Sequence, residues 1–531
     1  MKTKYIFASL IAASLGFTGC QDLDTLPEGS TITSTQKAEV IANDPSKAAA
    51  GVTAIFAQFN QYMPNYNSIG SRHNDFGYPS IMLFTDANGM DLVTEDNGYN
   101  WTGNSLDFSD RTYTSNEAQI VWNDLYSIIY IANNVIGSVS ADTEDKQAQF
   151  FLAQGLAGRA FAYFNLAQLY QFNYVGNQTK PCVPLITNEN SNQAATEGAP
   201  RATVEEVYTL IMSDINKSIE LLEKAKEQGM DRSDKRYIDV ATAYGLRARI
   251  NLTMQNWSAA ASDASNAISK STATPASMED VSKPAFWTVD ENNWMWGIII
   301  AETDDVVSSG IVNWISHMGS LNYGYANFSK GRQINKKLYN TIPATDVRKG
   351  WWLDANGISA NLNKEQQEYA TGKQYAAYTQ VKFAPYQNSV ATSTNANDIP
   401  LMRIEEMYLI KAEAEAMSGA DGKTTLENFV KTYRDPEYVC TDANVQEAVY
   451  LQRRIELWGE GLNWFDIMRL NKGVDRRGGG FPNATMIFNI PAGSDILLWR
   501  IPESEIQANP ALAEEDNNPA ADKPNPVPDN E

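Results

Sequence analysis

A pair of helices is predicted over residues 238–270, and this pair limits the architecture of the chain more than any other segment. Its first half reads IDVATAYGLRARINL, a short turn MQN follows, and the second half reads WSAAASDASNAISK. Ala248 stands in the first helix, Ala260 and Ala264 share one face of the second, and Trp257 lies at the turn. Because small side chains let antiparallel helices approach closely, the segment predicts a tightly packed helical hairpin.

Further helices of the same kind are predicted along the chain. The strongest, QAQFFLAQGLAGRAFAYFNLAQLYQ at 147–171, has apolar residues on several faces, so we expect it to be buried between other helices. Thr203 and Glu206 have the spacing of a capping box, which begins a helix. Apolar periodicity also predicts helices over 36–69, 117–137 and 402–418, the last followed by a partner in TTLENFVKTYR. These hairpins resemble tetratricopeptide repeats and predict a mainly α scaffold.

Two stretches lack this helical pattern. Residues 70–115 are rich in Gly, Asn, Asp and Tyr and are predicted to form long surface loops. Residues 272–400 are similar, apart from AFWTVDENNWMWGIII, in which alternation predicts a strand with Trp294 and Trp296 on one buried face. The fold class is therefore mainly α, with tetratricopeptide-like helical hairpins as a scaffold. A long irregular region, rich in loops and short strands, packs against it.

The N-terminus has the layout of an export signal. Lys2 and Lys4 precede an apolar run that is too short to span a bilayer, and Thr18 and Gly19 lead to Cys20. The cysteine after Thr-Gly resembles a bacterial lipobox, although Phe17 stands where Leu is usual. This predicts a signal peptide over 1–19, lipidation of Cys20 and a flexible acidic tether over 20–35. A plain secretory signal with a chance cysteine is the alternative.

Composition excludes several classes of partner. Among 531 residues the net charge is −22, which argues against nucleic acid and against anionic lipid surfaces. Beyond Cys20 only Cys182 and Cys440 remain; a disulfide between them is open, and two buried thiols are favoured. The two histidines, His73 and His317, are far apart in sequence, which argues against a histidine metal site. The last residues, 513–531, are Pro, Asp, Asn and Ala-rich, which predicts disorder.

Four segments, in this order behind a lipobox, resemble the SusD/RagB family of nutrient-binding outer-membrane lipoproteins from Bacteroidota. They are FFLAQGLAGRAFAYFNLAQLYQF followed by PCVPLIT, then LMRIEEMYLIKAEAEAMSG, RRIELWGEGLNWFDIMRL and IPESEIQANPAL. The third segment matches the family pattern at Arg453, Glu456, Leu457, Glu460, Gly461, Trp464, Phe465 and Asp466. The resemblance covers about 145–270 and 400–512. Phe172-Asn173-Tyr174 departs from it, where a Gly-containing turn is common.

The resemblance implies a surface protein that holds a nutrient, usually a glycan, and passes it to a SusC-like TonB-dependent transporter. It implies lipid anchoring at the outer membrane, no catalysis, no cofactor and no metal. One domain is expected over 36–512. Its scaffold spans about 145–270 and 400–470, and its variable, ligand-facing parts span about 70–115 and 272–400.

Sugar recognition needs exposed aromatic rings that stack on a pyranose, together with amides and carboxylates that bind hydroxyl pairs. Two glycine-punctuated stretches fit this requirement, TDANGMDLVTEDNGYNWTGN and WISHMGSLNYGYANFSKGR. The predicted ligand-binding residues are Asp91, Asn97, Tyr99, Trp101 and Asn104 in the first stretch, and Trp314, Tyr323, Tyr325 and Arg332 in the second. For each aromatic side chain the alternative is a plug that packs the loop on the core.

Three other functions compete with glycan binding. Relatives of this family also take peptides, and a helical-repeat adaptor would bind only proteins. A surface glycoside hydrolase would need a carboxylate pair, and Glu456 and Glu460 share a helix face beside Arg453 and Asp466. We favour a structural Arg–Glu network at these four positions, because the segment is dense in apolar residues.

Overall fold

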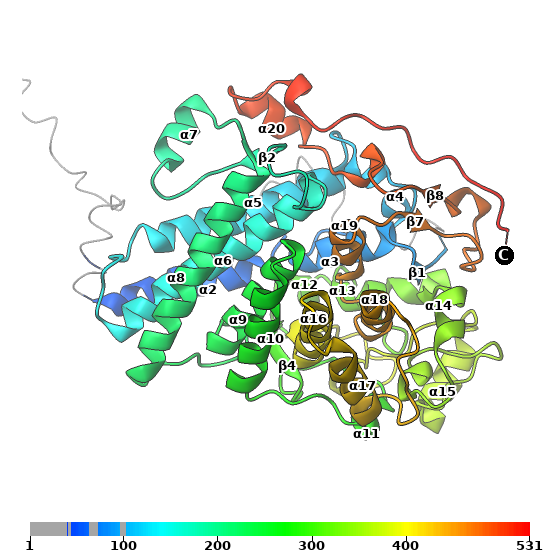
Figure 1. Cartoon of the computed structure of the whole chain (residues 1–531). Coiled ribbons are helices and arrows are strands. Elements are labelled where there is room, and N and C mark those ends of the chain that lie inside the picture. Colours follow the sequence, from blue (N-terminus) through cyan, green and yellow to red (C-terminus); the bar gives the residue numbers. More distant parts are fainter. Residues whose placement is uncertain (1–39, 41–43, 63–72, 96–101, 531) are drawn as a thin grey trace, which may run out of the picture.

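The structure is a computed structural model that describes residues 40, 44–62, 73–95 and 102–530 (Figure 1). Its longer helices are α2 (Ala49–Gln58), α3 (Tyr78–Asn88), α5 (Asn116–Ile136), α6 (Lys146–Tyr170), α8 (Val204–Glu227), α9 (Val240–Thr253), α10 (Trp257–Lys270), α16 (Ile404–Met417), α17 (Gly422–Tyr433) and α18 (Val445–Glu456). Its shorter helices are α4 (Gly103–Leu106), α7 (Ser191–Glu197), α11 (Met278–Val281), α12 (Asp305–Ser308), α13 (Trp314–Met318), α14 (Lys336–Thr341), α15 (Lys364–Gly372), α19 (Asn463–Arg469) and α20 (Glu503–Ala508).

The strands are short and form antiparallel pairs. These pairs are β1 (Leu92–Val93) with β5 (Gln333–Ile334), β2 (Pro181–Pro184) with β3 (Arg201–Thr203), β4 (Trp294–Ile298) with β6 (Ile399–Arg403), and β7 (Val474–Asp475) with β8 (Asn489–Ile490). The mainly α fold class is thereby confirmed.

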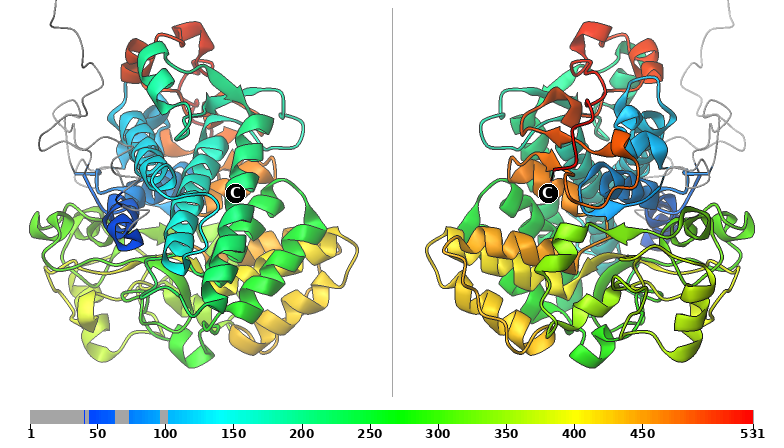
Figure 2. Two further views of the ribbon diagram at one scale, coloured as in Figure 1. Left: turned by 90° about the vertical axis from the view of Figure 1, so that its left-hand side faces the viewer. Right: turned by 90° about the vertical axis from the view of Figure 1, so that its right-hand side faces the viewer.

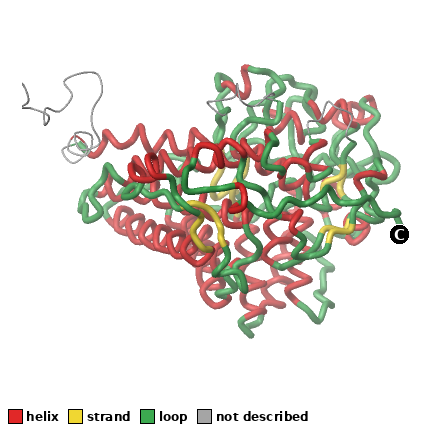
Figure 3. The backbone as a smooth tube through the Cα atoms, turned by 90° about the horizontal axis from the view of Figure 1, so that it is seen from above, coloured by secondary structure: helices red, strands yellow, loops and turns green. Residues whose placement is uncertain are grey.

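The scaffold is a row of helices in chain order. α5 packs on α6, α6 on α8, α8 on α9, α9 on α10, and α10 on α16, which also contacts α17 and α18. Figure 3 shows most of these long helices gathered in one part of the molecule, with loops dominating the other. The hairpin of α9 and α10 and the burial of α6 confirm the sequence predictions. The capping box of Thr203 and Glu206 is also present at the start of α8.

The first helix is shorter than the span of 36–69 that its apolar spacing predicts. A 3₁₀ turn, η1 (Pro45–Ala48), directly precedes α2, and the Asp44 carboxylate accepts a hydrogen bond from the Ser46 amide at 3.2 Å. Helix α2 then ends at Gln58. Asp44 and Pro45 together form a start signal, because a carboxylate cap and a proline in the first turn both favour a helix N-terminus.

Helix α3 corrects the prediction of surface loops over 70–115. All eleven of its residues, YPSIMLFTDAN, are buried. A helix that is covered on every side shows no polar stripe, so periodicity does not reveal it. Its end, with Thr85, Asp86 and Asn88, has the composition of a turn, although here the Thr85 hydroxyl donates to the Ile81 carbonyl at 2.9 Å.

The irregular middle region joins the scaffold through the β4–β6 pair, which leads directly into α16. Trp294 and Trp296 are both fully buried, as predicted. The Trp296 ring packs edge-on against Phe161 of α6 at 5.1 Å. In both views of Figure 2 the light-green part of this region lies in the lower half of the molecule, which it shares with the gold helices.

The C-terminal segment lies against the body, which differs from the disorder that its composition predicts. The Asn518 side-chain amide is buried and donates to the carbonyls of Tyr170 and Trp499, at 2.8 and 2.7 Å. The Val527 amide donates to the Ile487 carbonyl at 2.9 Å. These polar contacts satisfy buried carbonyl groups, so a segment with little apolar surface is still ordered.

Two further findings bear on anchoring and on the thiols. Within the described ranges, no helix is both long and apolar enough to cross a membrane. Cys182 and Cys440 are separate buried thiols, which answers the question of whether they pair. The signal peptide, Cys20 and the tether fall outside the described residues, so those predictions stand as they were made.

Candidate functional site

The two stretches predicted to bind ligand lie side by side. Strand β1 of the first pairs with β5, which directly follows the second, in a register that sets Leu92 opposite Ile334. The buried Arg332 guanidinium donates to the Thr94 hydroxyl at 2.6 Å and to the His317 carbonyl at 2.7 Å. Segments 238 residues apart therefore form one continuous region.

Tyr323 and Phe328 form an exposed pair of rings on this region, which we call the aromatic ledge. Their side chains are 42% and 47% exposed, and the rings meet edge to face at 6.1 Å. The Tyr323 amide donates to the Thr392 carbonyl at 2.8 Å, and the Asn395 side chain donates to the Tyr323 carbonyl at 3.1 Å. The ledge is thus exposed on a fixed backbone, which suits stacking on a sugar ring.

Phe328 was missed by the sequence analysis. It lies in the same glycine-punctuated stretch, NYGYANFSKG, as the aromatic residues that were chosen. Phe328 lies between Gly324 and Gly331, so counting every aromatic residue between these two glycines would have included it.

Trp314 and Tyr325 are buried, so in this structure they support the loop and do not offer a binding surface. Trp314 is 1% exposed and packs edge-on against Phe383 at 4.9 Å. Tyr325 is 5% exposed and its ring lies against His317 at 4.7 Å. This corrects the expectation that they contact ligand, and the reason is the core that residues distant in sequence build around them.

Asp91 is also buried, and its carboxylate is used within the protein. It accepts hydrogen bonds from Arg454 and Asn463, at 2.9 and 2.8 Å. It therefore positions β1 and does not face ligand. Asn104 is exposed, and its amide donates to both Glu117 oxygens, at 3.1 and 3.2 Å.

Three of the predicted residues, Asn97, Tyr99 and Trp101, lie outside the described residues and stay predictions. Among the predicted aromatic residues that the structure describes, Tyr323 is exposed, whereas Trp314 and Tyr325 are buried. Tyr323 remains in the candidate ligand-binding set together with Asn104, Asn97, Tyr99 and Trp101, and Phe328 is added to it.

The two histidines come together despite their distance in sequence. The His317 Nε2 atom donates to the His73 carbonyl at 2.7 Å, and the His73 Nδ1 atom bonds to the Tyr325 hydroxyl. Burial lowers the pKa of His73. Among the described residues, no group of three or more His, Cys, Asp or Glu side chains could hold a metal ion.

The carboxylates of the third family segment form a buried ionic network. Glu456 accepts from Arg434 at 2.8 and 2.9 Å, from Arg403 at 3.0 Å and from Arg348 at 3.1 Å. Burial by itself raises the pKa of Glu456, but the three guanidinium groups outweigh it and hold the pKa well below its usual value. Glu460 is bound by Lys382 in the same network, at 2.6 Å.

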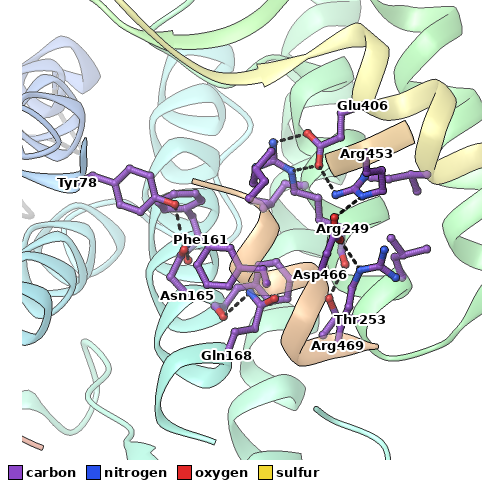
Figure 4. Close-up of a pocket in the computed structure, with 16 residues that line it drawn as sticks. Tyr78, Phe161, Asn165, Gln168, Arg249, Thr253, Glu406, Arg453, Asp466 and Arg469 are labelled. Carbon is purple, nitrogen blue, oxygen red and sulfur yellow. Dashed lines mark hydrogen bonds and ion pairs between the residues drawn. The ribbon is translucent and has the colours of Figure 1, made fainter. Parts of the chain in front are cut away.

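Asp466 and its partners line a small pocket, of about 40 Å³, between the scaffold helices (Figure 4). The Asp466 carboxylate lies between Arg453 and Arg469 and accepts at 2.7 and 2.8 Å. Arg249 pairs with Glu406 on the same wall. The pocket has room only for water. These carboxylates are buried and paired with cations, so the predicted structural network at these positions is confirmed.

Comparison with known proteins gives two family matches. A family model described as "Starch-binding associating with outer membrane" matches residues 79–252. The model of the SusD family matches residues 348–519. The first match runs from α3 to α9, and the second runs from residue 348 through α15 to α20 and on to residue 519; α10 lies between the two.

Individual relatives agree with these matches. SusD-like protein P2 of Formosa agariphila is 25% identical over 431 residues, which cover 75% of this chain and 79% of the relative. Among solved structures, a SusD-like carbohydrate binding protein from Bacteroides vulgatus has a TM-score of 0.70 at 24% identity, covering 89% of this chain and 97% of that one. Surface glycan-binding protein A from Bacteroides thetaiotaomicron, in complex with laminarihexaose, has a TM-score of 0.59 at 17% identity, covering 89% and 99%.

Proposed function

Because the chain belongs to the SusD/RagB family, we propose that it is a cell-surface lipoprotein that binds a nutrient glycan and delivers it to a transporter. The transporter would be a SusC-like, TonB-dependent protein of the outer membrane. Lipidation of Cys20 would hold the protein there. Two or three acyl chains suffice for this, since each buried methylene contributes about 0.8 kcal/mol.

The observation that carries the proposal is the aromatic ledge. Tyr323 and Phe328 are large apolar rings left exposed on a loop whose backbone is hydrogen-bonded on both sides. Adjacent exposed aromatic rings on a fixed backbone are a suitable surface for stacking on a sugar ring. Solved proteins of the same fold include surface glycan-binding protein A in complex with laminarihexaose, which supports a glycan as the ligand.

A surface site of two rings and a few amides buries little area. We expect weak binding of a single oligosaccharide, with a dissociation constant of roughly 1 mM to 1 µM. A polymer that reaches several anchored copies would bind far more tightly, because the second contact is intramolecular.

Affinity electrophoresis tests the proposal. Residues 21–531, expressed without the lipid anchor, are run through gels that contain laminarin, starch, xylan, mannan or alginate, with a casein digest as a separate competitor. Retardation by one polysaccharide, without loss of polymer over time, is the expected result. If no polysaccharide retards the protein and the casein digest binds to it in a peptide-binding assay, the ligand is a peptide and not a glycan. Release of reducing ends would point to a hydrolase.

The transporter contact needs a separate experiment. The full chain, with Cys20 intact, is solubilised from outer membranes and captured through a C-terminal tag. Co-purification of a TonB-dependent transporter is expected, and a Cys20→Ala variant should lose the membrane fraction. Recovery of the Cys20→Ala protein in the membrane fraction at the level of the unaltered chain would refute anchoring through this residue.

A further inference from the structure

A cleft lies in the middle region, and none of its lining residues belongs to the aromatic ledge. Its volume is about 590 Å³, within the range of roughly 300–1,000 Å³ that small-molecule sites occupy. One wall follows the chain from Ala276 to Asn293, and another is the start of α15 with Asn361, Asn363 and Gln366. Asn388, from the loop that follows the core residue Phe383, completes the lining.

Trp287 is the aromatic wall of the cleft, and it is held firmly. It is half-buried, and the Tyr386 ring meets it edge-on at 5.8 Å. Its amide donates to the Glu291 carboxylate at 3.0 Å, and its carbonyl accepts from the Asp398 amide at 3.0 Å. A ring whose backbone is fixed on both sides is a preorganised platform for stacking.

Two segments that line the cleft contain backbone conformations that residues with side chains avoid. Phe286, next to Trp287, has φ of +64°, and Gln387 and Asn388, which follow Tyr386, have φ of +52° and +56°. Phe286 is held in this conformation by the core, where the Lys382 ammonium and the Arg403 guanidinium both lie 4.9 Å from its ring centre. Such strain, of order 1–3 kcal/mol per residue, gathers at ligand sites more than elsewhere.

The polar lining suits hydroxyl groups and carries net negative charge. The side chains of Asn292 and Asn388 make no hydrogen bond to another residue of the described chain, so their amides face the cleft or solvent. Asp290 and Glu291 also line the cleft, and Lys283 there pairs with Asp280 at 2.9 Å. Burial raises the pKa of Glu291 to about 7, so the negative charge of the lining comes mainly from Asp290. Amides without partners bind sugar hydroxyls, and the carboxylate of Asp290 repels polyanions.

We propose that this cleft is a second glycan-binding site, selective for a neutral oligosaccharide that stacks one pyranose ring on Trp287. Its amides from Asn292 and Asn388 bind the hydroxyls of that sugar. This inference rests on the proposed function, because it assumes that the protein captures glycans. It predicts that the protein holds two glycan segments at once, one at the ledge and one at the cleft.

Titration calorimetry tests the cleft directly. Residues 21–531 are titrated with laminarihexaose, maltohexaose, cellohexaose, xylohexaose, mannohexaose and an alginate hexasaccharide. One neutral hexasaccharide is expected to bind at two sites, and Trp287→Ala is expected to weaken one of them at least tenfold. Trp287→Phe, which keeps an aromatic face, should retain most of the binding. The alginate hexasaccharide should not bind at this site.

Matched variants keep the result interpretable. Asn292→Ala removes an exposed amide that supports no other residue, so it should weaken the same site even if Trp287→Ala fails to fold. Trp257→Ala, a half-buried tryptophan on α10, is the control and should change nothing in binding. Tyr323→Ala should affect the other site only.

The outcomes separate the two proposals. If Trp287→Ala and Asn292→Ala both leave binding intact, the cleft is not a glycan site. If no neutral hexasaccharide binds the unaltered protein, the cleft proposal fails. Binding of alginate or of peptides in that case would still support a nutrient-binding function. If Tyr323→Ala and Phe328→Ala both leave binding intact while the two cleft variants weaken it, the ledge is refuted and the cleft remains.

Discussion

The Arg434 guanidinium donates to both oxygens of Glu456, at 2.8 and 2.9 Å, and both side chains are fully buried. This bidentate pair ties the loop after α17 to the end of α18. Arg403, in the strand that leads into α16, joins the same carboxylate at 3.0 Å. The ionic network therefore joins three separate elements at the centre of the second half of the scaffold.

We expect Glu456→Gln to destabilise the fold by about 3–5 kcal/mol, because it leaves buried guanidinium groups without their counter-charge. Urea unfolding followed by tryptophan fluorescence measures the change. Glu447→Gln is the matched control on the same helix. Glu447 pairs with Lys472 at 2.8 Å but is 44% exposed, so its loss should cost only about 0–1 kcal/mol. Equal effects of the two substitutions would contradict the network.

The aromatic ledge makes a prediction about binding. Tyr323→Ala and Phe328→Ala should each weaken retention by the preferred polysaccharide at least tenfold, because each removes half of the stacking surface. Their melting temperatures should stay within a few degrees of the unaltered protein, since both rings are exposed. Tyr130→Ala, at a ring on α5 that is 66% exposed, is the control. Unchanged retention of both ledge variants would remove this surface from the ligand site.

The buried carboxylates predict an acidic optimum of stability. Burial raises the pKa of Asp124 to about 8, above the value of 3.8 that it has in the unfolded chain. The folded state therefore binds this proton more tightly, and stability falls as pH rises from about 4 to about 8. Glu456 behaves oppositely. Its pKa is lowered in the folded state, so its contribution is present above the unfolded value and is lost as pH falls through the folded one.

The two effects together place the maximum of stability near pH 4, where the folded state binds the Asp124 proton and Glu456 is ionised. Asp124→Asn should flatten the decline toward pH 8, by up to about 1.4 kcal/mol for each pH unit between the two pKa values. Asp142→Asn, at an exposed position, should leave the profile unchanged. The free energy of unfolding in urea, measured at pH 5 and pH 8 for the unaltered protein and both variants, gives the decline in stability of each. A profile that rises steadily to pH 8 in the unaltered protein would count against this assignment.

The cysteines make a prediction about reactivity. Cys182 and Cys440 are both buried, and burial raises the pKa of the Cys182 thiol to about 12. In residues 21–531 neither should react with a maleimide under native conditions, and both should react in urea. A reducing agent should leave the melting temperature unchanged. A mass two units lower than that of the dithiol would instead reveal a disulfide.

Local patterns in the sequence were enough to predict the scaffold. The alanine faces of α9 and α10, the capping box at Thr203 and the apolar run of α6 each act within one helix or between neighbouring helices. They therefore fix the type of structure before any distant contact forms. The motif around Glu456 identified the family in the same way.

The binding residues could not be predicted by the same means. Asp91 and Tyr323 lie in equally polar, glycine-rich stretches, yet Asp91 is buried by Arg454, which is 363 residues away, and Tyr323 is left exposed. Helix α3 escaped notice because burial on every side erased its periodicity. Trp287 was passed over because its place on a cleft wall depends on Glu291, Asp398 and Asn388.

The sequence by itself determined the helical hairpins, the family and the kind of residue that could bind a sugar, since these follow from local spacing and side-chain chemistry. Only the tertiary structure decided which of those residues reach the surface. Exposure depends on long-range packing, and in this chain that packing joins segments hundreds of residues apart, as when Arg454 buries Asp91 and when β1 pairs with β5.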